Sequence, residues 1–229
     1  MPQSRDKAEV IRRILDEGVI PVIRADSAET AMRAIRAIQN GGVSVIEITM
    51  TVPGALDVIE ALANQPGDNA LIGAGTVLDK QTAQACVSAG AQFIVSPILK
   101  LEVIEYCVQI GVAVMPGTLT PTEVFEAWTA GSDLIKVFPA GAVGGASYIK
   151  ALNGPLPQVP LVPTGGVSLK TAGEFIRAGA AAVGVGGDLV DIEALRKGQD
   201  RAISDRARLF VETIREARSS IESAQHPWQ

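Results

Sequence analysis

The chain has 229 residues, of which 47% are apolar, and this is enough to bury a large core. Its formal net charge is -5 at pH 7 and only 4% of its residues are aromatic, so it lacks the basic surface and the stacking side chains that nucleic acid binding needs. We therefore expect no nucleic acid partner.

The first segment of the chain, MPQSRDKAEVIRRILDEG, is charged and contains no apolar run of the length that a signal peptide or a membrane span requires. Val10, Ile11, Ile14 and Leu15 instead fall on one face of a helix. The segment therefore predicts a short amphipathic helix, and we expect a cytoplasmic protein that does not enter a membrane.

Short apolar runs rich in β-branched residues then alternate with segments of helical periodicity. The expected strands span residues 19–25, 43–49, 70–76, 93–97, 112–117, 133–139, 160–166 and 181–187. Helix-like segments lie between them, as in 27–42, where Met32, Ile35 and Ile38 recur at helical spacing before a glycine. The last helix is expected at about residues 200 to 222. This alternation predicts parallel strands joined by helical crossovers.

Eight strand and helix units without a linker predict an α/β fold, a single (β/α)8 TIM barrel that spans residues 1–229 as one domain and carries an extra N-terminal helix. The alternative is an open doubly wound sheet, which has fewer strands and a dinucleotide turn after the first one. The run GAGTVL (73–78) follows the third expected strand and lacks the last glycine of that motif.

Cysteine and histidine are rare in this chain. Cys86 and Cys107 lie in helix-like stretches without a C-x-x-C spacing, so we expect buried free thiols. His226 is the one histidine and lies in a polar tail, which removes histidine-based triads, histidine-ligated zinc and a histidine general base from the body of the fold. Any chemistry must come from lysine, carboxylates, hydroxyls or backbone amides.

The C-terminal ends of the strands of a (β/α)8 barrel meet at one face, where active sites form. The polar side chains expected there are those of Arg24, Glu47, Thr49, Thr76, Ser96, Thr118 and Lys136. Glu47 and Lys136 are distinctive because each is ionisable within an otherwise apolar strand. An uncharged lysine can attack a ketone and form a Schiff base, with a glutamate as the acid and base. The alternative is an ion pair that only neutralises two buried charges.

Two pairs of glycines follow the last two strands, Gly165–Gly166 and Gly186–Gly187. Loops at these places bind phosphate in many barrels, because glycine lets backbone amides approach an anion. The alternative is that tight turns simply need glycine. Arg24 directly follows the run VIPVI and could hold a substrate carboxylate, or it could be a solvated residue beyond the strand.

The motifs VIEITMTVPGA, GAGTVL, FIVSP, VMPGTLTPTE, IKVFPAGAVGG, VPTGGVS and GVGGDLV occur in this order. Together they resemble the 2-keto-3-deoxy-6-phosphogluconate (KDPG) aldolase family, from about residue 19 to 190. The resemblance implies a metal-free class I aldolase that needs no cofactor, takes a small 2-keto acid and forms a homotrimer. It also implies that Lys136 forms the Schiff base and that Glu47 is the acid and base. The substrate contacts that it implies fall on Thr76, Pro97, Thr164, Gly165, Gly166, Gly186 and Gly187.

Two positions depart from the family pattern. Thr51 stands where many members carry the arginine that holds the substrate carboxylate, and Arg24 is expected to supply this contact instead. Asp188 stands where members often place a serine beside the phosphate. A carboxylate at this position repels a phosphate unless it turns away, for example to cap the following helix.

We therefore expect cleavage of KDPG to pyruvate and glyceraldehyde 3-phosphate. The alternatives are the same chemistry on 4-hydroxy-2-oxoglutarate or 2-keto-3-deoxy-6-phosphogalactonate, and a phosphate-binding barrel epimerase or synthase in which Lys136 only neutralises a substrate charge. A third class is a scaffold without catalytic activity.

Overall fold

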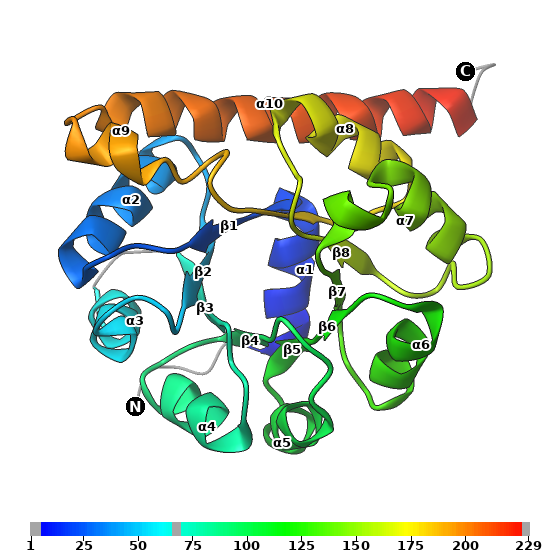
Figure 1. Cartoon of the computed structure of the whole chain (residues 1–229), viewed down its shortest axis with the longest axis horizontal. Coiled ribbons are helices and arrows are strands. Elements are labelled where there is room, and N and C mark those ends of the chain that lie inside the picture. The colour runs from blue at the N-terminus through cyan, green and yellow to red at the C-terminus, as the bar shows by residue number, and fades with distance from the viewer. Residues whose placement is uncertain (1–5, 66–69, 226–229) are drawn as a thin grey trace.

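The computed structural model describes residues 6–65 and 70–225, in which strands and helices alternate (Figure 1). The strands are β1 (Val19–Ile23), β2 (Val45–Thr49), β3 (Leu71–Gly75), β4 (Phe93–Val95), β5 (Ala113–Met115), β6 (Gly117–Thr118), β7 (Ile135–Val137), β8 (Leu161–Pro163) and β9 (Val183–Val185). The helices are α1 (Lys7–Glu17), α2 (Ala28–Asn40), α3 (Ala55–Ala63), α4 (Lys80–Ser88), α5 (Leu101–Ile110), α6 (Pro121–Thr129), α7 (Ala146–Asn153), α8 (Leu169–Arg177), α9 (Ile192–Arg196) and α10 (Asp200–Gln225), with a 3-10 turn, η1 (Ala140–Val143).

The strands form two parallel ladders, with the orders β5-β4-β3-β2-β1-β9 and β6-β7-β8. Only Pro116 separates β5 from β6, and its carbonyl oxygen accepts the Lys136 N–H at 3.0 Å. At the other side, Thr164 and Gly184 form an isolated parallel bridge between the ends of β8 and β9. The result is an α/β fold in which a curled parallel sheet is surrounded by helices (Figure 1).

The order of elements confirms the alternation expected from the sequence, with two differences. The expected strand 112–117 is divided into β5 and β6 at Pro116, because proline has no N–H to donate to a ladder. Helix α9 was not expected, because it has only 5 residues and lies between the eighth expected strand and the last helix, which the sequence placed next to each other. The expected N-terminal helix is present as α1, and the last helix is present as α10.

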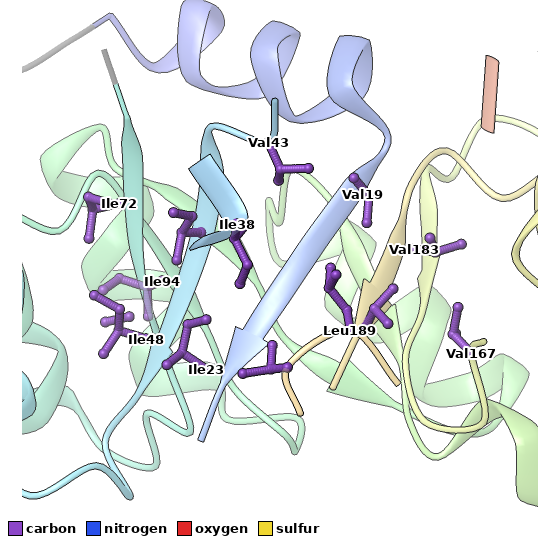
Figure 2. Packing of buried hydrophobic residues seen from close by; sticks show 14 of the residues in the cluster. Val19, Ile23, Ile38, Val43, Ile48, Ile72, Ile94, Val167, Val183 and Leu189 are labelled. Atoms are coloured by element: carbon purple, nitrogen blue, oxygen red, sulfur yellow. The ribbon is translucent and has the colours of Figure 1, made fainter. Parts of the chain in front are cut away.

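The outer face of the sheet packs against the helices. Alternate residues of a strand point to opposite faces, and in β2 Ile46 and Ile48 belong to the cluster that also contains side chains of the surrounding helices. Figure 2 shows part of this cluster, with Ile23, Ile48 and Ile94 from three strands and Ile38 from α2. The continuous apolar character of the strands therefore reflects burial on both faces.

The inner face of the sheet has its own apolar cluster, and α1 covers it at one end. Val10 and Ile14 of α1 are buried together with inner residues such as Val45 and Phe93. Phe93 fills the space beside Gly73, where a Cβ atom would lie 2.3 Å from its ring. The N-terminal helix thus closes one end of the curled sheet, and the polar groups described below lie toward the other end.

Helix α10 packs across α2 and α8, as Figure 1 shows. Its buried side chains include Ile203, Phe210 and Ile214, and its exposed face is charged. No helix in the described part of the chain is long and apolar enough to cross a membrane.

The structure confirms the expected free thiols in α4 and α5. Cys86 and Cys107 are both fully buried. Burial raises the pKa of the Cys86 thiol to about 11 and that of the Cys107 thiol to about 12. Because the thiolate is the reactive form, neither cysteine is suited to nucleophilic chemistry near neutral pH.

We predict that the native protein will not react with a thiol reagent such as DTNB at pH 8. At this pH about 0.1% or less of each thiol is ionised and both are shielded from solvent. Unfolding in guanidinium should release two reactive thiols per chain, and a Ser219→Cys variant with a thiol on the exposed surface of α10 should react at once. Rapid labelling of the native wild type would contradict this packing.

Candidate active site

The strand β7 carries a lysine toward the inner face of the sheet. Ile135 and Val137 belong to the outer cluster and Leu134 to the inner one, so the two-residue period places Lys136 on the inner face. Its side chain is 3% exposed. Lys136 therefore does not reach the surface, and a buried ammonium needs a partner or must lose its proton.

The partner is Glu47 of β2, whose side chain is also 3% exposed. Its Oε1 lies 3.5 Å from the Lys136 Nζ. Room for the carboxylate comes from β3, because a Cβ atom on Gly75 would lie 2.0 Å from Oε1. Two strands that are far apart in the sequence thus bring an amine and a carboxylate together, and a third strand supplies the space.

The contact between the two groups is loose for a buried ion pair. Strong charge-assisted N–H···O bonds measure about 2.7 to 2.9 Å, and the Lys136–Glu47 contact is longer, at 3.5 Å. The amine also lies 5.7 Å from the centroid of the Phe138 ring, within the range of a cation–π contact. The amine is held in position without being tightly bound to the carboxylate.

Two of the other strand-end hydroxyls serve the backbone. The Thr118 hydroxyl donates to the carbonyl oxygen of Lys136 at 3.1 Å, and the Ser96 hydroxyl accepts the Ile98 N–H at 3.3 Å. Thr118 therefore stabilises the pairing of β6 with β7, on the strand that carries the lysine.

Thr76, Pro97 and Thr164 all lie at strand ends. Thr76 has a φ of +59°, which costs a β-branched residue about 1 to 3 kcal/mol and is most common at functional sites. Pro97 is half-buried, and its backbone lies where a Cβ atom on Gly117 would be. Thr164 is buried, with its hydroxyl directed at Gly184, where a Cβ atom would lie 2.2 Å away.

Arg24 and Thr51 lie at the ends of neighbouring strands. The Thr49 hydroxyl donates to the carbonyl oxygen of Ile23 at 2.9 Å and meets the Thr51 hydroxyl at 2.6 Å. This bond holds the residue before Arg24 against the end of β2. Both Arg24 and Thr51 are exposed. Because they follow neighbouring parallel strands, an arginine at either position would lie at the same C-terminal end of the sheet.

The two glycine pairs differ in backbone conformation, and therefore in the reason why glycine is present. Gly165 and Gly166 have φ values of +84° and +79°, so the turn after β8 needs glycine. Gly186 and Gly187 have no positive φ, and a Cβ atom on either would meet nothing within 4 Å. Turn geometry therefore explains the first pair but not the second, whose backbone borders open space.

Asp188 turns away from the glycines, but not to cap the helix that follows. The cap of α9 is Asp191, which accepts the Ala194 N–H at 2.9 Å. One oxygen of Asp188 accepts the N–H of Leu169, the first residue of α8, at 3.1 Å. The other pairs with Arg206 of α10 at 3.2 Å. The expectation that Asp188 caps the following helix was thus wrong, and α8, whose first N–H it accepts, has Ser168 as its own N-cap.

The sequence analysis missed two residues that shape this region. Gly75 makes room for the Glu47 carboxylate, and Arg206 neutralises Asp188. Gly75 had a detectable signal, because glycine is uncommon inside a buried strand and marks a close approach. Arg206 had none, since it is one of several charged residues on α10.

A family model and a curated relative identify the family. The model for "KDPG and KHG aldolase" matches residues 10–205. The 2-dehydro-3-deoxy-6-phosphogalactonate aldolase of Escherichia coli K12 is 37% identical over 201 residues, which cover 87% of this chain and 95% of that protein.

Two solved structures show the same likeness. The KDPG aldolase of Legionella pneumophila, with pyruvate captured at low pH as a covalent carbinolamine intermediate, has a TM-score of 0.80 at 32% identity and covers 87% of this chain and 96% of its own. A cube-shaped protein cage designed by fusing symmetric oligomeric domains has a TM-score of 0.81 at 34% identity and covers 92% of this chain and 76% of its own. This chain belongs to the KDPG and KHG aldolase family.

Proposed function

We propose that this protein is a class I aldolase that cleaves KDPG to pyruvate and glyceraldehyde 3-phosphate and catalyses the reverse reaction. The observation that carries the proposal is the buried pair of Lys136 and Glu47, with 3.5 Å between Nζ and Oε1. Membership of the family supports it, as does the covalent pyruvate adduct of the Legionella relative.

Cleavage begins with the amine. The uncharged Nζ of Lys136 adds to the C2 ketone and forms a carbinolamine. Glu47, within reach of the same atoms, gives a proton to the departing hydroxyl, so that water leaves and a protonated iminium forms. The loose contact supports this role, because an amine in a tight ion pair is not free to attack.

The bond between C3 and C4 breaks in the next step. The Glu47 carboxylate takes the proton of the C4 hydroxyl, the aldehyde forms at C4, and the electron pair of the bond moves to the iminium nitrogen to give an enamine. Glu47 returns this proton to C3, water adds to the iminium that results, and Glu47 takes up the released proton as pyruvate leaves and the uncharged amine of Lys136 is restored. The inner apolar face around the pair keeps other water away.

The ends of the substrate lie at opposite sides of the Schiff base. Arg24, Thr76 and Pro97 hold the carboxylate end of the substrate. The exposed Arg24, at the C-terminal end of β1, supplies the positive charge. Thr164 and the amides of the two glycine pairs, Gly165–Gly166 and Gly186–Gly187, hold the distal phosphate. The open space at the second pair supports an approach of ligand to backbone.

The same proposal includes the fold and the assembly. The two ladders close into one eight-stranded barrel, in a single domain of residues 1–229, through Pro116 and the Thr164–Gly184 bridge. The protein works in the cytoplasm as a homotrimer. Large exposed apolar side chains, those of Leu78, Ile98 and Leu101, support an interface between copies.

Two other substrates would use the same chemistry. The family model covers KHG aldolases, and the relative from E. coli is named for the phosphogalactonate. Cleavage rates with KDPG, 2-keto-3-deoxy-6-phosphogalactonate and 4-hydroxy-2-oxoglutarate rank the three directly.

We predict that borohydride will trap pyruvate on Lys136. Incubation of the protein with both reagents should add the mass of a reduced pyruvyl group to the peptide that contains this residue, as peptide mass spectrometry would show. A Lys136→Ala variant should give no adduct and no cleavage. A Lys150→Ala variant, which removes an exposed lysine of α7, should behave as the wild type. A folded wild type without adduct would favour an epimerase or synthase.

We predict that Glu47→Gln will lower the cleavage rate by about 10²- to 10⁴-fold, the usual contribution of general acid–base catalysis. The amide keeps the size of the side chain but cannot take a proton from the C4 hydroxyl. The matched control is Glu17→Gln, which alters a glutamate at the covered end of the sheet, hydrogen-bonded to Ser44 and Val45. The control should cleave at the wild-type rate. If Glu47→Gln did so as well, Glu47 would not be the base.

We predict that Arg24→Gln will raise KM for pyruvate and for KDPG about 10- to 100-fold, because a hydrogen bond to a charged group contributes about 1.5 to 3 kcal/mol. The value of kcat should change much less, since the arginine does not touch the reacting bond. Arg36→Gln, on the exposed face of α2, is the control. An unchanged KM would assign the carboxylate to another group.

A further inference from the structure

We propose that Asp188 is a positioning residue that holds the two glycine loops together around the distal phosphate of the substrate. Asp188 does not touch the substrate in this proposal, and it acts through the backbone of Gly165–Gly166 and Gly186–Gly187. The inference rests on the proposed function, because it concerns the phosphate end of the same site.

Asp188 connects three elements of the fold. It directly follows Gly187 in the loop between β9 and α9. Its carboxylate accepts the Leu169 N–H at 3.1 Å, three residues beyond Gly166 at the start of α8. It also pairs with Arg206 of α10 at 3.2 Å. One side chain thus joins the loop after β8 to the loop after β9 and anchors both to a long helix.

The first loop has a second anchor on its other side. The Gly141 N–H donates to the carbonyl oxygen of Gly165 at 2.8 Å, and a Cβ atom on Gly141 would lie 2.9 Å from the Cα atom of Gly166. The chain that leaves the lysine strand therefore packs directly on this loop. The Gly141 contact does not reach the second glycine pair. Asp188 joins the loop of Gly165–Gly166 to that pair.

The second loop depends on this link more than the first. Gly186 and Gly187 have no side chain, and a Cβ atom on either would meet nothing within 4 Å. The turn itself is held by the Leu189 and Val190 N–H groups, which both donate to the carbonyl oxygen of Gly186. Those bonds shape the turn but do not join it to the loop after β8. The carboxylate of Asp188 does so.

The charges suit a site for an anion. A free carboxylate beside the glycines would repel a phosphate, but both oxygens of Asp188 are occupied and point toward α8 and α10. Arg206 offsets the negative charge. Its Nε is buried without a hydrogen-bond partner among the residues that the structure describes, and its Nη2 atom contacts Asp188.

The test compares two substrates that differ only at the distal end, KDPG and the unphosphorylated 2-keto-3-deoxygluconate. In Asp188→Ala, we expect KM for KDPG to rise about tenfold, the loss of a charge-assisted hydrogen bond. Neither kcat nor the kinetics of the unphosphorylated substrate should change more than about twofold. A substitution that merely loosened the fold would affect both substrates alike.

The matched control is Asp191→Ala. It removes the same kind of side chain three residues further on, where the carboxylate caps α9 by accepting the Ala194 N–H. We expect it to leave the ratio of kcat/KM for the two substrates unchanged.

The outcomes separate this inference from the proposed function. A wild type that forms no pyruvate adduct overturns the aldolase assignment itself. A wild type that forms the adduct but cleaves both substrates equally well overturns only the phosphate site. If the wild type prefers KDPG and Asp188→Ala keeps this preference, the positioning role is wrong. Should Asp188→Ala fail to fold, Asp188→Asn keeps the size of the side chain, weakens the contacts with both Leu169 and Arg206, and allows the same comparison of the two substrates.

Discussion

The contact between Lys136 and Glu47 is the constraint on which the rest of the site depends. Two ionisable side chains, each 3% exposed, lie on the inner face of the sheet, next to a cluster of buried apolar residues. A pair of this kind gains little stability over apolar side chains of the same size. Its position therefore fits the proposed chemistry better than a role in folding alone. The neighbouring strands accommodate the pair, because Gly75 leaves space for the carboxylate and the Thr118 hydroxyl bonds to the backbone of the lysine.

The two glutamates Glu17 and Glu47 differ in their hydrogen-bond partners, and this difference distinguishes a structural carboxylate from the proposed catalytic one. Glu17 accepts hydrogen bonds from the Ser44 N–H, the Ser44 hydroxyl and the Val45 N–H. Burial raises the pKa of Glu17, and these bonds oppose the rise. Its oxygens are thus used to join α1 to β2. Glu47 instead meets a loosely held amine, an arrangement that suits the proton transfers proposed for it.

The sequence was sufficient to predict the alternation of elements, the inward lysine and the family, because each leaves a local pattern. A charged residue inside an apolar strand is visible without coordinates, and so is glycine after a strand. It also brought together Glu47 and Lys136, which are 89 residues apart, but it was not sufficient for contacts that no strand pattern marks. The role of Gly75 depends on the packing of β3 against β2, and the partners of Asp188 lie 19 and 18 residues away. The division of the fifth strand at Pro116 was readable in principle, since proline cannot donate to a ladder.

The two ends of the sheet divide stability from chemistry. At the end covered by α1, polar side chains make structural contacts. Lys7 pairs with Asp133 at 2.9 Å, and Asp133 in turn accepts the Val114 N–H. At the other end, Thr76 carries backbone strain, and the second glycine pair leaves its backbone beside open space. A fold keeps such costs only where the groups have another use. The stable end holds the strands in register, and this register sets the distance between the amine and the carboxylate.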